Sequence, residues 1–135
     1  MEIHIKTIPS SNQRYPTVGD YFYDDLGALQ VRISDMSTAG NEKLAELYHK
    51  MVAIHELVEE ALTKFRGLSE PEILDFDIYY EKKREQGLVD ELSEPGFNNN
   101  CPYLREHTLA SSVEMMMCAL AGISWTDYDN YVNNL

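Results

Sequence analysis

The first part of the chain alternates between apolar and polar positions with a period of two. Residues 2–8 set isoleucines among polar side chains, which predicts a half-buried strand. Residues 21–23 and 29–33 are aromatic and β-branched runs on either side of a turn that contains Gly27, and they predict a hairpin. We expect the strand and the hairpin to form one small antiparallel sheet.

After residue 40 the apolar positions recur at three and four, which indicates helices. A first helix is predicted over 41–66, with Gly67 as its C-cap. The run Ser69-Glu70-Pro71-Glu72 is a capping-box pattern with proline in the first turn. It predicts a second helix over 70–86.

A loop and two more helices complete the predicted chain. Residues 88–102 are rich in Pro, Gly and Asn, and loops of that length in small domains commonly serve a function. The third helix should start near Pro102 and end before Gly122. Its second half, 113–121, is apolar on nearly every side, which is typical of a central buried helix. A short fourth helix can start at Ser124.

These elements predict an α+β fold, with a small N-terminal antiparallel sheet packed on a bundle of three to four helices. A chain of 135 residues can bury one core but not two, so we expect a single domain over 1–135. Residues 1–36 should be mainly β and residues 41–135 mainly α. The third helix should lie buried, with the second and fourth helices beside it.

The charge restricts the classes of partner. A net charge of -12 argues against direct binding of nucleic acid or of an anionic membrane, because both repel an acidic surface. No run approaches the eighteen apolar residues of a membrane span, and the first residues lack the apolar core of a signal peptide. Cys101 and Cys118 form no CxxC pair, which is typical of a reduced cytoplasmic chain.

The oligomeric state is left open by the sequence. Tyr21, Tyr23 and the pair Tyr79-Tyr80 are expected at the surface, where they could serve a homo-oligomer interface or cover the core.

Candidate chemistry gathers in the first helix. His55 and Glu59 stand four residues apart and project from one face, whereas Glu56 is displaced by about 100°. His55 falls inside the apolar arc, Glu59 lies at its edge and Glu56 leans outward. A carboxylate at the core edge needs a cation, a hydrogen-bond donor or a metal. The alternative is a hydrogen-bonded core histidine beside a solvated acidic face.

The third helix supplies a second polar set. Glu114 lies seven residues beyond His107, and therefore on nearly the same face. A carboxylate followed by three methionines must be hydrogen-bonded, ion-paired or metal-bound. A salt bridge from Arg105 or from a lysine of the second helix is the alternative to a functional role.

The segment His55-Glu56-Leu57-Val58-Glu59 resembles the HExxH signature of zinc-dependent peptidases, with Glu59 in place of the second histidine. The resemblance implies that His55 and Glu59 bind a divalent metal and that Glu56 is the general base. Ligands from the third helix would complete the site: Glu106, His107 or Glu114. The leading hypothesis is thus a metal-binding domain, holding Zn or Mg, with a hydrolase-like HExxE site between two helices. Its substrate would be a small molecule or a peptide.

The same region also resembles the MazG-like nucleotide pyrophosphatases, whose magnesium site uses ExxE followed by ExxD. Here Glu56-Leu57-Val58-Glu59 is followed by Glu72-Ile73-Leu74-Asp75. The resemblance implies an alternative Mg²⁺ site in which four carboxylates hold the ion and the ion bridges substrate phosphates. Those carboxylates are Glu56, Glu59, Glu72 and Asp75.

The whole chain, including the runs 14–20, 94–96 and 105–107, resembles small uncharacterised proteins of bacteriophages and prophages. The resemblance implies the cytoplasm of a bacterium or of a phage-infected host cell. It also suggests a third hypothesis, a non-catalytic acidic protein that binds a basic surface of a host protein. The net charge of -12 is compatible with such a role.

Overall fold

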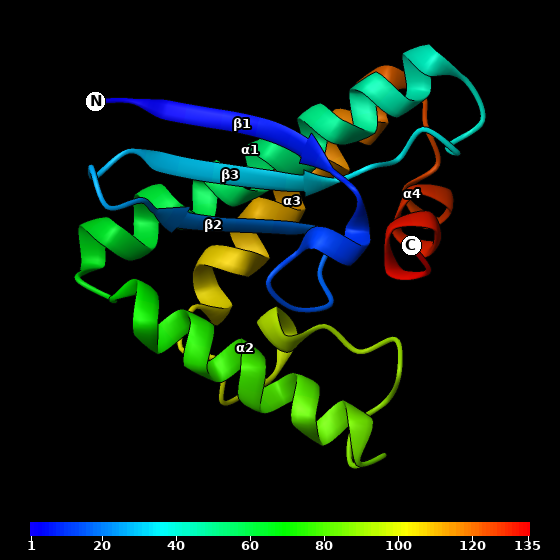
Figure 1. The fold of residues 1–135 in the computed structure, drawn as a ribbon. Coiled ribbons are helices and arrows are strands. Elements are labelled where there is room, and N and C mark those ends of the chain that lie inside the picture. The colour runs from blue at the N-terminus through cyan, green and yellow to red at the C-terminus, as the bar shows by residue number, and fades with distance from the viewer.

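The computed structural model describes residues 1–135 as a three-stranded sheet followed by four α-helices (Figure 1). The α+β class is therefore confirmed. The strands are β1 Ile3–Ile8, β2 Gly19–Tyr23 and β3 Leu29–Ser34, and the helices are α1 Glu42–Arg66, α2 Glu70–Glu85, α3 Leu104–Ala121 and α4 Trp125–Asn133. Two short 3-10 turns are also present, η1 Ser10–Asn12 and η2 Pro95–Phe97.

The sheet is mixed rather than antiparallel throughout. β2 and β3 form the expected antiparallel hairpin, with Tyr21 opposite Val31. β1 instead pairs with β3 in parallel, so the strand order is β1-β3-β2. The expected direction of β1 was wrong because alternation along a strand does not specify the direction of its neighbour. Residues 9–18 carry the chain past the central position, where β3 then inserts.

The helix boundaries follow local signals in the sequence. The side chain of Asn41 accepts a hydrogen bond from the Leu44 amide at 2.9 Å, and Gly67 ends α1 with a positive φ of 83°. Ser69 and Glu72 form the expected capping box at the start of α2. Local capping signals therefore fix both ends of α1 and the start of α2.

The helices are layered on the sheet. α1 packs across one face of the sheet, and α3 packs against α1 (Figure 1). Val31 and Ile33 of β3 share an apolar core with Met51 and Val52 of α1. Because this core occupies the sheet-facing side of α1, another side of α1 meets α3, and that contact carries the polar residues.

The burial of α3 differs from the expectation. Met115 and Met116 are 45% and 57% exposed, so the methionine-rich half is not enclosed by neighbours. The buried side instead carries the polar residues His107, Ser111 and Glu114, spaced by four and three, together with Ala110 and Cys118. A helix segment that is apolar on every side does not indicate which side packs. In α3, hydrogen-bond partners on other elements allow the side with polar residues to be buried.

The exposed tyrosines are also fewer than expected. Tyr79 is 53% exposed, whereas Tyr21 and Tyr80 are buried. Their hydroxyl groups reach Thr63 and Ser93, at 3.1 and 2.8 Å respectively, and this pairing allows the phenol rings to be buried. None of the helices combines the length and the apolar composition that a membrane crossing requires.

Candidate metal centre

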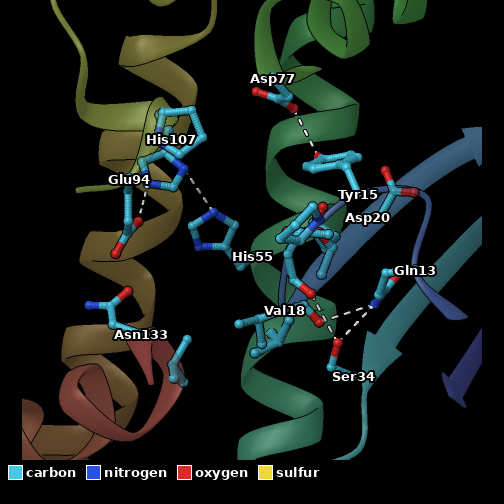
Figure 2. A pocket seen from close by; sticks show the side chains of 18 of the residues that line it. Gln13, Tyr15, Val18, Asp20, Ser34, His55, Asp77, Glu94, His107 and Asn133 are labelled. Atoms are coloured by element: carbon cyan, nitrogen blue, oxygen red, sulfur yellow. Dashed lines mark hydrogen bonds and ion pairs between the residues drawn. The ribbon is translucent and has the colours of Figure 1, made fainter. Parts of the chain in front are cut away.

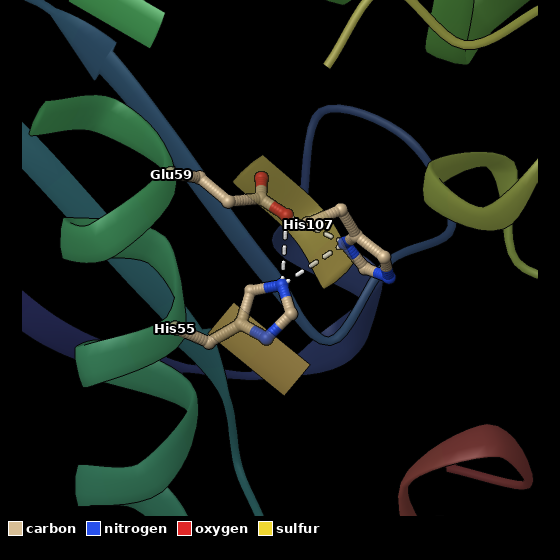
Figure 3. Close-up of side chains that lie close together, drawn as sticks. All are labelled: His55, Glu59 and His107. Carbon is tan, nitrogen blue, oxygen red and sulfur yellow. Dashed lines mark hydrogen bonds and ion pairs between the residues drawn. The ribbon is translucent and has the colours of Figure 1, made fainter. Parts of the chain in front are cut away.

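His55 and Glu59 of α1 meet His107 of α3 where the two helices pack together (Figure 3). Oε1 of Glu59 lies 2.8 Å from Nε2 of His55 and 2.5 Å from Nδ1 of His107. The two ring nitrogens are 3.1 Å apart. All three side chains are buried. They form a group that could hold a metal ion, and they bring together three of the six residues proposed from the sequence for the leading site.

A carboxylate holds the outer nitrogen of each histidine. Nδ1 of His55 lies 3.1 Å from Oε2 of Glu114, and Nε2 of His107 lies 2.9 Å from Oε2 of Glu94. When these outer nitrogens carry the ring protons and donate them to the carboxylates, the inner nitrogens present lone pairs toward Glu59. Metal-binding histidines are oriented by the same kind of partner.

The electrostatics of this arrangement favour a cation between the three inner atoms. Two lone pairs and a carboxylate oxygen at 2.5 to 3.1 Å repel one another unless a proton or a metal lies between them. Tetrahedral ligation at about 2.0–2.1 Å separates ligand atoms by about 3.3 Å, so the group needs to open by less than about 1 Å. Two imidazoles and one carboxylate suit Zn²⁺ or another transition metal better than Mg²⁺, which prefers oxygen ligands.

Without a metal, the two histidines of the cluster hold their protons more strongly than an ordinary histidine. Burial alone would lower the pKa of His107, but hydrogen bonds to Glu59 and Glu94 outweigh burial and raise it to about 9. Burial also lowers the pKa of His55, but the negative charges of Glu59 and Glu114 outweigh burial. The pKa of His55 is therefore raised well above 6.5. A bound metal would displace these protons, so its affinity should rise with pH.

Glu56 was expected to lean outward, but it is buried beside the cluster. It is 9% exposed, faces the cavity and forms no side-chain hydrogen bond with the protein. The reason is that β2 covers this side of α1: a Cβ atom at Gly19 would overlap the Glu56 carboxylate and Val52. Burial first, and then the charge of Glu59, hold the pKa of Glu56 well above 4.5.

The structure separates the other predicted ligands from the cluster. Glu106 turns toward Arg66, whose Nε donates to it at 2.7 Å. Glu72 closes the capping box of α2, and Asp75 is exposed on the same helix. The four-carboxylate magnesium site is therefore not assembled, because its second pair of carboxylates lies outside the cavity that the first pair lines.

Glu114 supports the three-residue group through His55 and does not belong to the group itself. Besides contacting His55, it accepts a hydrogen bond from the Tyr128 hydroxyl at 2.6 Å. The alternative salt bridge with Arg105 is thus not formed. Tyr128 belongs to α4 and is 1% exposed, so the last helix fixes the carboxylate that fixes the histidine.

Two residues of the site, Glu94 and Tyr128, were not predicted from the sequence. Glu94 lies in the long loop whose length indicated a function, and the 3-10 turn η2 that follows places Gly96 directly against the ring of His107. A Cβ atom at Gly96 would overlap that ring. The length of the loop was therefore a usable signal, but nothing in the sequence paired the loop with His107.

The cluster lies in the wall of a cavity of about 680 Å³ (Figure 2). This volume accommodates a small molecule or a short peptide segment. On the α2 side, Asp77 accepts hydrogen bonds from Tyr15 at 2.9 Å and from Tyr103 at 2.5 Å. Burial raises the pKa of Asp77 to about 7, although the two hydroxyl groups oppose the shift.

No protein-family model, curated protein or solved structure matches this chain. The resemblances to zinc-dependent peptidases, to MazG-like pyrophosphatases and to phage proteins therefore stay predictions. The description of the site therefore rests on the geometry of its side chains.

In the presence of a chelator, the protein should become less stable as the pH rises from about 6.5 to about 9. The pKa of His107 is raised to about 9 in the folded state, so its protonation stabilises the fold below pH 6.5 and is lost as the pH passes 9. Urea unfolding should show a loss of up to roughly 3 kcal/mol in the free energy of unfolding. Glu94→Gln should flatten this slope, and a flat profile for the native protein would contradict the account.

Replacing Gly96 by alanine should displace the His107 ring, because the added methyl group occupies the same space as the ring. We expect Zn²⁺ affinity to fall by about 10- to 100-fold, as for other changes behind a metal ligand. Competition with a chromogenic chelator measures the affinity. Gly19→Ala is the matched comparison, since it crowds Glu56 and should leave Zn²⁺ affinity nearer to native. Equal losses in both variants would show that the effect is not specific to His107.

Proposed function

We propose that the protein is a metal-dependent hydrolase that binds a divalent transition metal through His55, Glu59 and His107. One observation carries the proposal. Both histidines are held by carboxylates at their outer nitrogens, while their inner nitrogens converge with one carboxylate oxygen in the wall of a cavity. A histidine that only fills a core needs no such matched set of partners.

A metal with three protein ligands keeps one position open and acts there as a Lewis acid that lowers the pKa of water to about 7. The protein must then supply a group that accepts a proton. Glu56 suits this role because its carboxylate faces the cavity without a protein donor. Burial and the charge of Glu59 raise its pKa, which makes the carboxylate a stronger base than an ordinary glutamate.

The non-catalytic hypothesis makes a different prediction from the same chain. A net charge of -12 supports binding of a basic host protein through the acidic surface. That hypothesis, however, gives no reason for buried carboxylates to converge on two histidines. We therefore favour the metal-dependent function, and the metal content of the protein separates the two hypotheses.

Protein purified without a chelator is expected to contain about one equivalent of a divalent transition metal. His55→Ala, Glu59→Ala and His107→Ala should each lose most of it, because each removes one of three ligands. Inductively coupled plasma mass spectrometry measures zinc, iron and manganese together. Glu106→Gln is the matched control and should retain the metal, since Glu106 pairs with Arg66 outside the cluster. Native metal content in all three ligand variants would sink the proposal.

Glu56→Gln should keep the metal but lose activity by about 10²- to 10⁴-fold, the usual contribution of a general base. The substrates to be compared are amides, esters, phosphodiesters and nucleoside triphosphates, and the last class tests the pyrophosphatase hypothesis directly. If the metal-loaded native protein hydrolyses none of these, or if Glu56→Gln is fully active, the hydrolytic role is wrong.

A further inference from the structure

We propose that the cavity beside the metal centre selects substrates that carry a positive charge, of the amine or guanidinium class. This deepens, and rests on, the proposed metal-dependent function. Three features of the cavity support it: the excess of carboxylates in its walls, one buried carboxylate without a protein partner, and the aromatic rings around the space.

The walls of the cavity are strongly acidic. Ten of the lining residues are Asp or Glu, and two are Arg. Arg14 is paired with Asp20 through contacts of 2.6 and 2.8 Å, and Arg84 with Glu81 at 3.0 and 3.1 Å. Neither arginine is therefore free to neutralise an anionic group on a substrate, and a divalent metal would offset only part of the negative charge.

Most buried carboxylates in the cavity already have donors from the protein. Glu114 receives the Tyr128 hydroxyl, and Asp77 receives the hydroxyls of Tyr15 and Tyr103. Glu56 is different, because it is 9% exposed, lines the cavity and has no protein donor. A buried carboxylate without a partner is unfavourable. An ammonium or guanidinium group on a ligand supplies both the missing N–H donors and the opposite charge.

The two roles of Glu56 are compatible in one carboxylate. A carboxylate has two oxygens with about four acceptor sites, so one oxygen can accept a proton from water while the other accepts a hydrogen bond from the substrate.

Aromatic rings line the same space. A cation within about 6 Å of a ring centroid is attracted to the face of the ring, whereas an anion is not. Phe97 places such a ring next to the metal centre, with its centroid 4.5 Å from that of His107. Five more aromatic residues line the cavity: Tyr15, Tyr21, Tyr103, Trp125 and Tyr128. The rings and the carboxylates thus favour the same sign of charge.

Three metal-chelating probes of matched size test the preference: β-alanine hydroxamate, butyrohydroxamate and succinic monohydroxamate. At pH 7 their tails are cationic, neutral and anionic. Dissociation constants follow from the visible spectrum of the Co²⁺-loaded protein. We expect the cationic probe to bind about 10-fold more tightly than the neutral probe and about 100-fold more tightly than the anionic probe.

Two variants locate the source of the preference. Glu56→Gln should bring the cationic and neutral probes to within about 2-fold of each other without loss of Co²⁺. Asp75→Asn removes a carboxylate from the exposed surface of α2, outside the cavity, and should leave the native preference intact. Because the probe series is first measured on the native protein, the result does not depend on the folding of either variant.

Each outcome has a distinct meaning. Equal affinities for the three probes, or tightest binding of the anionic probe, overturn the charge preference and leave the metal site standing. A Co²⁺ spectrum that no probe changes overturns the metal-dependent function, and with it the substrate class.

Discussion

Oε1 of Glu59 is the atom on which the arrangement of the site depends. It lies within 2.8 Å of ring nitrogens from two different helices, and so joins α1 to α3 at the wall of the cavity. The surrounding partners follow from this contact. Once the inner nitrogens turn toward Glu59, the outer nitrogens need partners, and these come from Glu114 and from the loop residue Glu94. Elements distant in sequence are thereby fixed around one oxygen.

Local signals were sufficient for the helix ends and for half of the site. Asn41, Gly67 and the capping box at Ser69 fixed α1 and the start of α2, because a cap is decided within one turn. The four-residue spacing of His55 and Glu59 likewise fixed their common face. These features depend only on residues that are neighbours along the chain.

Features that depend on distant partners could not be predicted in the same way. The parallel pairing of β1, the outward methionines of α3 and the inward turn of Glu56 are all decided by elements that pack from elsewhere. The sequence suggested five ligands and one general base for the leading site, and the structure brings the ligands His55, Glu59 and His107 together. The side chain of Glu106 instead pairs with Arg66, which lies forty residues away in the sequence.

Crystals of the metal-loaded protein, with anomalous diffraction recorded on both sides of the metal absorption edge, give the most direct test of the metal centre. The account predicts one anomalous peak bonded to Nε2 of His55, Oε1 of Glu59 and Nδ1 of His107 at about 2.0–2.2 Å. It also predicts that Glu94 and Glu114 stay on the outer nitrogens. A peak bonded to other residues, or no peak at the cluster in fully loaded protein, would contradict it.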